Sequence, residues 1–490
     1  MGNSKNATLN NMNAANKKSG IIFIPFLVFL AIYISSGVYH LRQGVVFPFS
    51  KFPSAAAMFI ALVIAFILNK TVYKHTVDES FSIFASGAGS ESTIMMVMIY
   101  LLAGAFSTLC TEIGARDSVV NFCLSFMPVK FATAGMFVIA GLMSIATGTS
   151  AGSIAALLPI GAPLAQACGI NIYMMTGAII SGAMVGDNLS MISDTTIAAT
   201  KTQGVEMKDK FRMNAMIALP AAIITLILFL CFGAPKDVSA VEIGEYNFIK
   251  IIPYIVILVL SLCGMNVFMA MVCGIFTVTV IAFATGSLTI PGFASTVWSG
   301  FTGMDQSTFM TILTTGLTAL VAFNGGINWL TSKMRSSMKT HKGAQVGIAA
   351  MTALIDMSVA NNTVAIIVTG PIAKEVSQKY KIDPRRTASL LDVFACSTQA
   401  LLPYCGQILQ ATGIIAVALE GMSVSPLNFI PYVWYCPLLA LFAVISIFVP
   451  FADGVTKKDP WNWEYNCPES KVEEVKATLE AVKVEATPAE

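Results

Sequence analysis

The chain has 490 residues, of which 56% are hydrophobic and only 11% are charged. Soluble globular domains carry about 25% charged residues, so this composition excludes an ordinary soluble enzyme and predicts a protein embedded in membrane lipid. The formal net charge of +2, with no basic stripe, gives no reason to expect a nucleic-acid partner.

The N-terminal segment 1–19 is polar and rich in Asn, and we expect it to be a disordered cytoplasmic N-terminus. Lys17 and Lys18 precede an apolar run and resemble the start of a secretory signal peptide. Because that run is long and no A-x-A-like cleavage site follows it, we expect a first helix that is retained.

Apolar runs long enough to cross a bilayer recur along the chain. A transmembrane helix needs roughly 17 to 25 apolar residues. Clear spans are predicted at about residues 21–39, 54–72, 93–110, 132–148, 213–234, 249–264, 266–286, 307–323, 344–357 and 429–450.

Two apolar regions, 149–200 and 358–412, are interrupted by Gly, Ser, Thr, Asn and Pro. Irregular backbone at membrane depth is tolerated only where protein buries it or where it lines a cavity. These regions therefore indicate re-entrant hairpins and broken helices. The predicted fold class is an all-α polytopic membrane protein with about 10–12 membrane segments.

An internal repeat is the strongest organisational signal. The segment GLMSIATGTSAGSIAALLPIGAPLA resembles AAMTALIDMSVANNTVAIIVTGPIA when Pro163 is placed on Pro371, an offset of 371 − 163 = 208. Chance similarity of two Ala- and Ile-rich segments is the alternative, but the order of the flanking elements repeats as well. We therefore predict a first transmembrane repeat at 20–235 and a second at 236–452.

The basic residues predict that the two repeats have inverted topology. Loop 201–212 has four Lys or Arg, whereas its counterpart 413–428 has none. Loop 374–386 has five, and its counterpart 166–172 has none. Since cytoplasmic loops retain positive charge, equivalent loops lie on opposite sides of the membrane. The expected location is the plasma membrane, the bacterial inner membrane, with both termini cytoplasmic.

The C-terminal segment 453–490 is soluble in composition and is predicted to be a cytoplasmic tail. The part from Lys471 to Glu485 has the pattern of a short amphipathic helix. We assign the tail no function from its sequence.

The interrupted segments of the two halves supply candidate ligands for an ion or a substrate. Hydroxyls, side-chain amides and freed carbonyls are hard oxygen ligands suited to Na⁺, and exposed helix N-termini can hold a carboxylate. The alternative is that small residues here only allow close helix packing. The candidates are Thr149, Ser150 and Ser153 in the first half and Asn361, Asn362 and Thr363 in the second.

A carboxylate-containing stretch follows in the first half. Asp187, Ser190 and Asp194 would share one face if the stretch were helical. A carboxylate inside a membrane normally faces a polar cavity, pairs, or binds and releases a cation. One carboxylate could make Na⁺ and H⁺ mutually exclusive, which is the minimal chemistry of antiport. The alternative is that each Asp caps a half-helix. We predict Asp187 and Asp194 as Na⁺ ligands, with Asn188, Thr195 and Thr196 beside them.

The equivalent stretch of the second half, 385–407, differs in its chemistry. At the offset of 208, Ala395 and Leu402 stand where the first half has carboxylates. The second half offers Asp392, Ser397 and Thr398 instead. Asp356 and Asp392 are weaker candidates, because either could equally pair with the basic loop around Arg385 and Arg386 in a structural role. We therefore expect the titrating chemistry in the first half and neutral ligands in the second.

These stretches resemble the NhaC family of Na⁺/H⁺ antiporters, in the wider ion-transporter superfamily. GDNLSMISDTT (Gly186 to Thr196) is similar to that family's G-D-x-x-S-x-x-S-D-T-T stretch. RTASLLDVFACSTQALLPY (Arg386 to Tyr404) is similar to a looser run that usually ends in Trp. The resemblance implies Na⁺/H⁺ exchange and an elevator-like homodimer. Its matched positions are Asp187, Ser190, Asp194, Thr195, Thr196 and Asp392.

The expected function is secondary active transport, first as a Na⁺/H⁺ antiporter. The alternative is a Na⁺- or H⁺-coupled transporter of a small amino acid or organic acid, since the resembled family includes such carriers. An intramembrane aspartyl protease is disfavoured because residues 184–187 read MVGD rather than G-x-G-D. No G-x-x-x-x-G-K-[ST] loop is present, so ATP is not expected to drive transport. No cofactor is expected beyond the transported ions.

Overall fold

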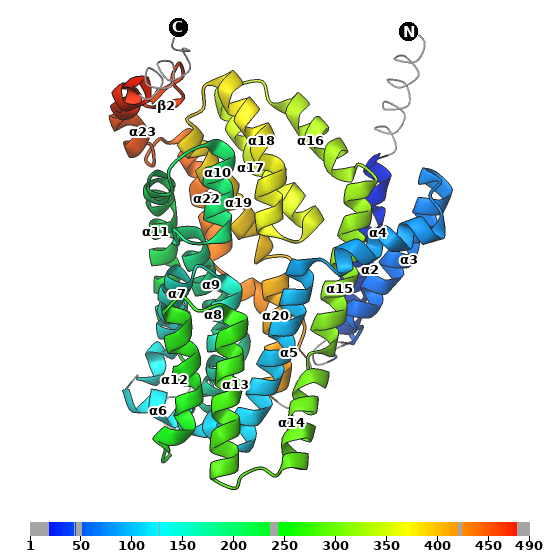
Figure 1. The fold of residues 1–490 in the computed structure, drawn as a ribbon, viewed down its shortest axis with the longest axis vertical. Helices are drawn as coiled ribbons and strands as arrows, with labels where there is room; N and C mark the ends of the chain where they lie inside the picture. Colours follow the sequence, from blue (N-terminus) through cyan, green and yellow to red (C-terminus); the bar gives the residue numbers. More distant parts are fainter. Residues whose placement is uncertain are drawn as a thin grey trace, which may run out of the picture.

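A computed structural model describes residues 19–43, 45, 51–126, 128–235, 244–419 and 424–477. These residues are almost entirely helical (Figure 1). The described strands are β1 (Trp461–Asn462) and β2 (Cys467–Pro468), an antiparallel pair in the tail. The predicted all-α polytopic fold is confirmed. The N-terminal segment predicted to be disordered lies, up to residue 18, outside the described residues.

The helices fall into four consecutive groups along the chain. The first comprises η1 (Ser19–Phe23), α2 (Ile24–Arg42), α3 (Ser54–Leu68), η3 (Asn69–Tyr73), α4 (Val77–Ala88), α5 (Glu91–Glu112), α6 (Ala115–Phe126) and η4 (Val129–Phe131). The second comprises α7 (Ala132–Thr147), α8 (Ser150–Ala167), α9 (Ile172–Leu189), α10 (Asp194–Gln203) and α11 (Met207–Phe232). The third comprises α12 (Phe248–Leu262), α13 (Val267–Ala284), α14 (Ile290–Thr302), α15 (Asp305–Phe323) and α16 (Gly326–Ser337). The fourth comprises α17 (His341–Val359), α18 (Asn362–Tyr380), α19 (Pro384–Gln399), α20 (Gly406–Ala418), α21 (Pro426–Phe429), η5 (Ile430–Tyr432) and α22 (Tyr435–Phe448).

Fewer helices than predicted are both long and apolar enough to cross a membrane unaided. Among the described residues there are 8, or up to 9 if the bent pair Pro426–Tyr432 and Tyr435–Phe448 is one span. The predicted segments at 249–264 and 344–357 correspond to α12, which is short, and α17, which is not among the 8. The interrupted regions form helices that are broken at Gly148, Ser190 and Ala360, where the chain leaves the right-handed helical conformation. One of these helices, α8, is itself among the 8.

The second and fourth groups repeat one another, but in a different register from the one predicted. Thr149 caps the N-terminus of α8, and Asn361 caps that of α18, at an offset of 361 − 149 = 212. Asn171 and Asp383 cap α9 and α19 at the same offset, 383 − 171 = 212. The offset of 208 was therefore wrong by four residues. Four residues are close to one helical turn, so the apolar pattern is similar in both registers.

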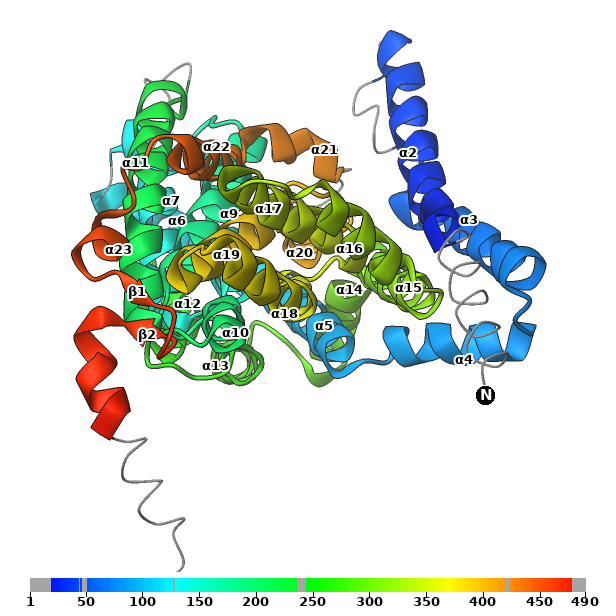
Figure 2. The ribbon, with the colours of Figure 1, turned by 90° about the horizontal axis from the view of Figure 1, so that it is seen from above.

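Each group contains a helical hairpin, the first formed by α7 and α8 and the second by α17 and α18. The two hairpins come from different ends of the molecule. Figure 1 shows α17 and α18 near the upper end, with α7 and α8 below them. The largest apolar core joins α7, α8 and α9 to α5, α11, α12, α13, α20 and α22. In the view from above, α2, α3 and α4 lie at one edge, away from α11 and the tail (Figure 2). These three helices pack with α15 around a second, smaller core.

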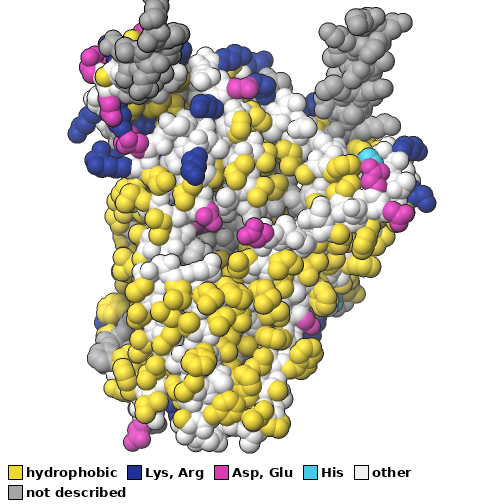
Figure 3. All heavy atoms as spheres, in the orientation of Figure 1, with side chains coloured by type: hydrophobic (Ala, Val, Ile, Leu, Met, Phe, Trp, Pro, Cys, Tyr) yellow, Lys and Arg dark blue, Asp and Glu magenta, His cyan; other side chains and the backbone are white. Residues whose placement is uncertain are grey.

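Charged side chains are unevenly distributed over the surface. Figure 3 shows Lys and Arg gathered at the upper end of the molecule, above a broad apolar surface. The tail elements α23 (Gly454–Lys458), β1, β2 and η6 (Glu469–Lys471) lie at this same end (Figure 1). Such an apolar surface, bordered by a basic end, is the expected exterior of a protein in a bilayer.

The tail docks on the ends of the helices. Arg385, at the start of α19, forms an ion pair with Asp383 at 2.7 Å and donates to the Asp459 carbonyl at 2.5 Å. Partial burial opposes ionisation of Asp459, but hydrogen bonds from Ser470 and the charge of Arg385 outweigh it and lower the pKa of this carboxyl. The predicted amphipathic helix begins at residue 472, and its part beyond 477 lies outside the described residues.

Candidate ion-binding site

Asp187 is a carboxylate on which both hairpins converge. Its side chain lies in the last turn of α9, and the residue is 5% exposed. Ser150 Oγ, from the tip of the first hairpin, donates to Asp187 Oδ2 at 3.0 Å. Asn362 Nδ2, from the tip of the second hairpin, donates to the same oxygen at 3.3 Å. Ser193 Oγ donates to Oδ1 at 2.8 Å, so both carboxylate oxygens are engaged.

Close packing of α9 against α7 positions this carboxylate. Gly182 and Gly186 form a small-x-x-x-small pattern on α9. A Cβ at Gly182 would lie 2.1 Å from the Phe137 carbonyl oxygen, and one at Gly186 would lie 2.2 Å from Ser144 Cβ. Ser144 Oγ also donates to the Ala183 carbonyl at 2.7 Å. The two backbones therefore touch directly before Asp187, and any larger residue would displace it.

The hairpin tips are alike in their backbone. In each, a left-handed residue ends the first helix, with φ +71° at Gly148 and +52° at Ala360. A capping side chain then begins the second helix. Thr149 Oγ1 accepts from Gly152 N at 3.3 Å, and Asn361 Oδ1 accepts from Val364 N at 3.0 Å. These two predicted site residues therefore act as helix caps that aim the N-termini of α8 and α18 at the site.

A buried ion pair lies next to this carboxylate. Lys210 Nζ, on α11, is 2.7 Å from Asp392 Oδ2, on α19, and the two side chains are 1% and 0% exposed. Asn188 Nδ2 and Asn214 Nδ2 donate to the same Asp392 oxygen at 2.7 Å and 2.8 Å. Because Asn188 directly follows Asp187, the end of α9 connects the two acidic groups. The expected alternative partner of Asp392, the basic loop before α19, is not its partner in the structure.

The charges of this cluster do not balance. With both carboxylates ionised, Asp187 and Asp392 face the single ammonium of Lys210, which leaves one negative charge in a buried site. An isolated buried charge is unfavourable unless it is neutralised. One monovalent cation, or one proton, would restore neutrality.

The second half contributes amides where the first has its acid. In the register of 212, the counterpart of Asp187 is Gln399, since 399 − 187 = 212. Gln399 Nε2 donates to Gln407 Oε1 at 3.0 Å and to the Ala360 carbonyl at 3.2 Å. Gln407 Nε2 donates to Ser150 Oγ at 3.2 Å, which links this pair to Asp187. The predicted asymmetry between the halves therefore remains in the corrected register, with Gln399 rather than Ala395 opposite the acid.

The remaining predicted residues surround the site at different distances from Asp187. Thr195 shares a hydrogen bond of 2.9 Å with Ser193, and Thr196 Oγ1 accepts from Lys210 at 2.6 Å. Ser153 and Ser190 donate to backbone carbonyls of Thr149 and Ile145, at 3.1 Å and 2.8 Å. Three further residues, on the last turn of α19 and the first turn of α18, make no described side-chain contact with the carboxylate: Ser397, Thr398 and Thr363.

Asp194 is not brought to the cluster. The helical stretch that would have placed it on one face with Asp187 ends at Leu189, because Ser190 takes an extended conformation with ψ 137°. Asp194 then begins a separate helix and is exposed. Its predicted role as a second Na⁺ ligand beside Asp187 does not fit this geometry. It supplies negative charge to the first turn of α10 instead.

Sequence reasoning missed Lys210, Asn214, Ser193 and Gln407. Lys210 was counted among the basic residues of a loop, although it lies in α11 and is buried. Its spacing gave a usable signal, since Lys210, Asn214 and Ile217 recur at i, i+4 and i+7 on the buried face of that helix. Ser193 lies inside the motif that was singled out, one residue before the Asp that was chosen.

Two hairpins from different ends of a membrane protein, meeting at a buried carboxylate and an ion pair, define a secondary transporter. The chain belongs to the Na⁺/H⁺ antiporter family, whose family model matches residues 3–234 and 238–451. It is a multi-pass protein of the plasma membrane.

Several characterised transporters are similar to this chain. The malate-2H⁺/Na⁺-lactate antiporter of Bacillus subtilis (strain 168) is 22% identical over 481 residues, which cover 91% of this chain and 96% of that protein. The Na⁺/H⁺ antiporter NhaC of Alkalihalophilus pseudofirmus is 27% identical over 154 residues, 31% of this chain and 33% of the relative. The arginine/ornithine antiporter ArcD of Halobacterium salinarum is 21% identical over 439 residues, which cover 80% of this chain and 86% of that protein.

Proposed function

We propose that this chain exchanges Na⁺ for H⁺ across the plasma membrane, with Asp187 as the group that binds either ion. The observation that carries this proposal is the convergence of both hairpin tips on one carboxylate oxygen, through Ser150 at 3.0 Å and Asn362 at 3.3 Å. A cation bound at Asp187 would thus lie next to both hairpin tips, one from each repeat.

The charge balance supports exchange of one cation for another. Asp187 and Asp392 exceed Lys210 by one negative charge, so the site is neutral only when it holds Na⁺ or H⁺. Both ions need the same carboxylate, so one must leave before the other binds. An empty, charged site is costly to move through lipid, and this favours exchange over leak.

The oxygens around Asp187 suit Na⁺. The hydroxyls of Ser150, Ser193 and Thr195 lie within hydrogen-bond distance of Asp187 or of one another. A hydroxyl can turn its proton away and present a lone pair to a cation. Carboxylate and hydroxyl oxygens together form a hard ligand set.

Proteoliposomes with an imposed Na⁺ gradient test this proposal. A dye inside the vesicles reports internal pH while Na⁺ moves down its gradient. Three proteins are compared: the wild type, the Asp187→Asn variant and the Asp194→Asn variant. We expect H⁺ movement with wild type and Asp194→Asn, and none with Asp187→Asn. Wild-type exchange by Asp187→Asn would refute the proposal.

A second candidate is Na⁺- or H⁺-coupled transport of a small organic acid or amino acid. The N-termini of α8 and α18 both point into the site, and helix N-termini bind carboxylates. The Bacillus subtilis relative, which matches this chain over 96% of its length, is named as a malate-2H⁺/Na⁺-lactate antiporter. Counterflow of labelled malate, lactate and arginine in the same proteoliposomes distinguishes the two candidates. Uptake that requires Na⁺ or H⁺ favours the second, and ion exchange without organic uptake favours the first.

We further propose that both termini are cytoplasmic. The basic end of the surface, which also carries the tail, supports this orientation (Figure 3). Single cysteines at exposed Lys208 and Glu245, in a chain whose exposed Cys231 and Cys263 are changed to Ser, test it. Lys208→Cys should react only with cytoplasmic label, and Glu245→Cys only with external label. The homodimer that the family resemblance implies also remains a proposal. Measuring the mass of the protein in detergent would test it.

A further inference from the structure

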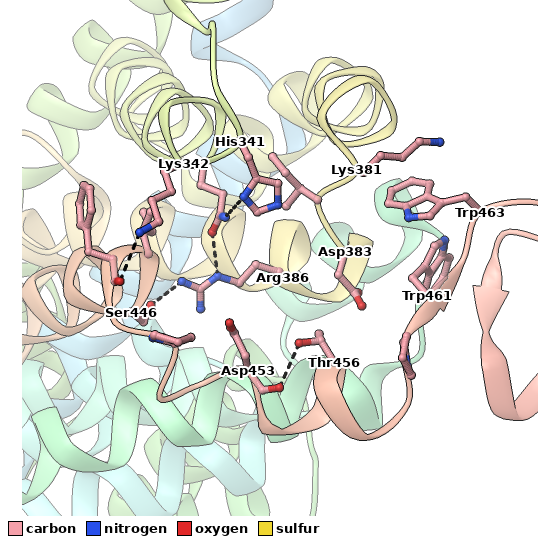
Figure 4. A pocket seen from close by; sticks show the side chains of 16 residues that line it. His341, Lys342, Lys381, Asp383, Arg386, Ser446, Asp453, Thr456, Trp461 and Trp463 are labelled. Carbon is pink, nitrogen blue, oxygen red and sulfur yellow. Dashed lines mark hydrogen bonds between the residues drawn. The ribbon is translucent and has the colours of Figure 1, made fainter.

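A cavity of about 400 Å³ lies between the docked tail and the membrane helices, apart from the ion site (Figure 4). It is bordered by the starts of α17 and α19, the end of α22 and the tail. Its charged lining residues are Lys342, Lys381, Asp383, Arg386 and Asp453, and its aromatic lining includes Trp461 and Trp463. Its volume falls in the range of small-molecule sites.

The guanidinium of Arg386 has an unused donor at this cavity. Arg386 is 4% exposed. Its Nε donates to Gln345 Oε1 at 3.1 Å, and one terminal nitrogen donates to Ser446 Oγ at 2.5 Å. The other terminal nitrogen is buried and has no hydrogen-bond partner among the described residues. Figure 4 shows the guanidinium at the middle of the cavity lining. An unpaired buried donor on a permanent cation is unfavourable unless an acceptor occupies the space beside it.

The lining has an excess of positive charge. Lys342, Lys381 and Arg386 face Asp383 and Asp453 across the cavity. Asp383 is already neutralised by two hydrogen bonds from Arg385, at 3.0 Å and 2.7 Å. Only Asp453 is left to oppose three cations.

The two lysines are held loosely and could turn toward a ligand. Lys342 Nζ donates to the Phe448 carbonyl at 3.4 Å, and Lys381 Nζ lies 4.7 Å above the Trp463 ring. Both residues are exposed. In addition, the buried indole Nε1 of Trp461 has no partner among the described residues, which adds another free donor to the lining.

We propose that this cavity binds a small oxyanion bearing carboxylate or phosphate groups, with Arg386 as its buried anchor and Lys342 and Lys381 at its rim. The planar guanidinium suits both groups. Asp392 is the sixth residue after Arg386 on α19, about 9 Å along the helix. The cavity is thus distinct from the ion site but shares a helix with it, so an anion here would tie α19 to α17, α22 and the tail.

Calorimetry of the full-length chain in lipid-free detergent tests the proposal, with inorganic phosphate and citrate as probes. We expect saturable binding of at least one probe. The double variant Lys342→Gln/Lys381→Gln should weaken it about tenfold or more, and Arg386→Gln should abolish it. The double variant changes only exposed side chains, so it stays informative if Arg386→Gln does not fold. Lys458→Gln removes an exposed charge from the tail outside the cavity and should bind as the wild type does.

A lipid headgroup could supply the same chemistry, so a second arm uses nanodiscs. If phosphatidylglycerol, compared with phosphatidylcholine, raises the unfolding temperature of the wild type but not of the double variant, the oxyanion belongs to a lipid. Binding of phosphate or citrate in detergent assigns the site to a free anion. Absence of both effects overturns the proposal, as does equal loss in Lys458→Gln. The readout is binding, so it does not depend on the proposed ion exchange.

Discussion

The two hairpin tips share a backbone and differ in side chains. Thr149 and Asn361 cap equivalent helices, yet the acid Asp187 of the first half is matched by the neutral Gln399 of the second. The two halves thus share the frame that brings two helix N-termini together, while the carboxylate on which both tips converge belongs to the first half alone. The difference teaches that a symmetric backbone arrangement can hold an asymmetric site, in which one carboxylate accepts hydrogen bonds from both hairpin tips.

The largest effect on transport is expected at the position where the halves differ most. Asp187→Asn keeps the shape and one oxygen that accepts hydrogen bonds, but it removes the charge that a cation needs. We expect loss of Na⁺-driven H⁺ movement by about 100-fold or more, equivalent to about 2.7 kcal/mol. Vesicle pH measurements check this, with Asp194→Asn as the matched control. A comparable loss in both variants would mean that general acidity near the site, rather than the carboxylate at the hairpin tips, is what matters.

The buried ion pair should dominate stability. Lys210→Met leaves Asp392 without its cation, and breaking such a pair costs about 3–5 kcal/mol. The double variant Lys210→Met/Asp392→Leu removes both charges and should recover most of that stability. Unfolding temperatures in detergent measure both, with exposed Lys201→Met as control. Equal unfolding temperatures for Lys210→Met and Lys201→Met would show that the pair contributes nothing.

The two tips can be compared directly through their donors to Asp187. Ser150→Ala and Asn362→Ala each remove one hydrogen bond to the same oxygen. Hydrogen bonds to charged groups contribute about 1.5–3 kcal/mol, so we expect each variant to raise the Na⁺ concentration for half-maximal exchange about tenfold or more. Ser150→Ala should have the larger effect, because Ser150 also accepts from Gln407. If only one variant has an effect, then only one of the two hairpin tips contributes to ion binding at Asp187.

The smallest effect concerns the left-handed residue of each tip. Ala360 has φ +52°, a conformation that costs a residue with a Cβ about 1–2 kcal/mol relative to Gly. Ala360→Gly should therefore leave stability unchanged or raise it by about 1 kcal/mol. Gly148→Ala should lower it, since its Cβ would lie 2.8 Å from Ile192 Cγ1. Opposite signs in thermal unfolding support equivalent tips, and equal signs contradict it.

Most of the architecture follows from the sequence because it depends on local chemistry. Apolar length predicts helices, and clustered Gly, Ser, Asn and Thr predict the breaks, so Asp187, Ser150 and Asn362 were expected at the site. The register was missed because a shift of one helical turn leaves the apolar pattern almost intact. The helix caps, Thr149 with Asn361 and Asn171 with Asp383, distinguish the two registers.

The errors within the site have a common physical cause, which is the direction of a side chain after a helix ends. Asp194 was grouped with Asp187 by helical spacing, but the extended Ser190 interrupts the helix between them. Lys210 was assigned to a loop, but α11 begins before it and buries it against Asp392. Residue type predicted which groups could bind an ion, whereas tertiary packing decided which of them meet.

The central claim, that Na⁺ and H⁺ compete for Asp187, is tested most directly by measuring ²²Na⁺ binding to the purified chain across a pH series. Competition for one carboxylate predicts that, in the acidic range, each unit fall in pH raises the half-saturating Na⁺ concentration about tenfold. Asp187→Asn should remove saturable binding. A half-saturating concentration that does not change with pH, or pH-dependent binding that persists in Asp187→Asn, would contradict the account.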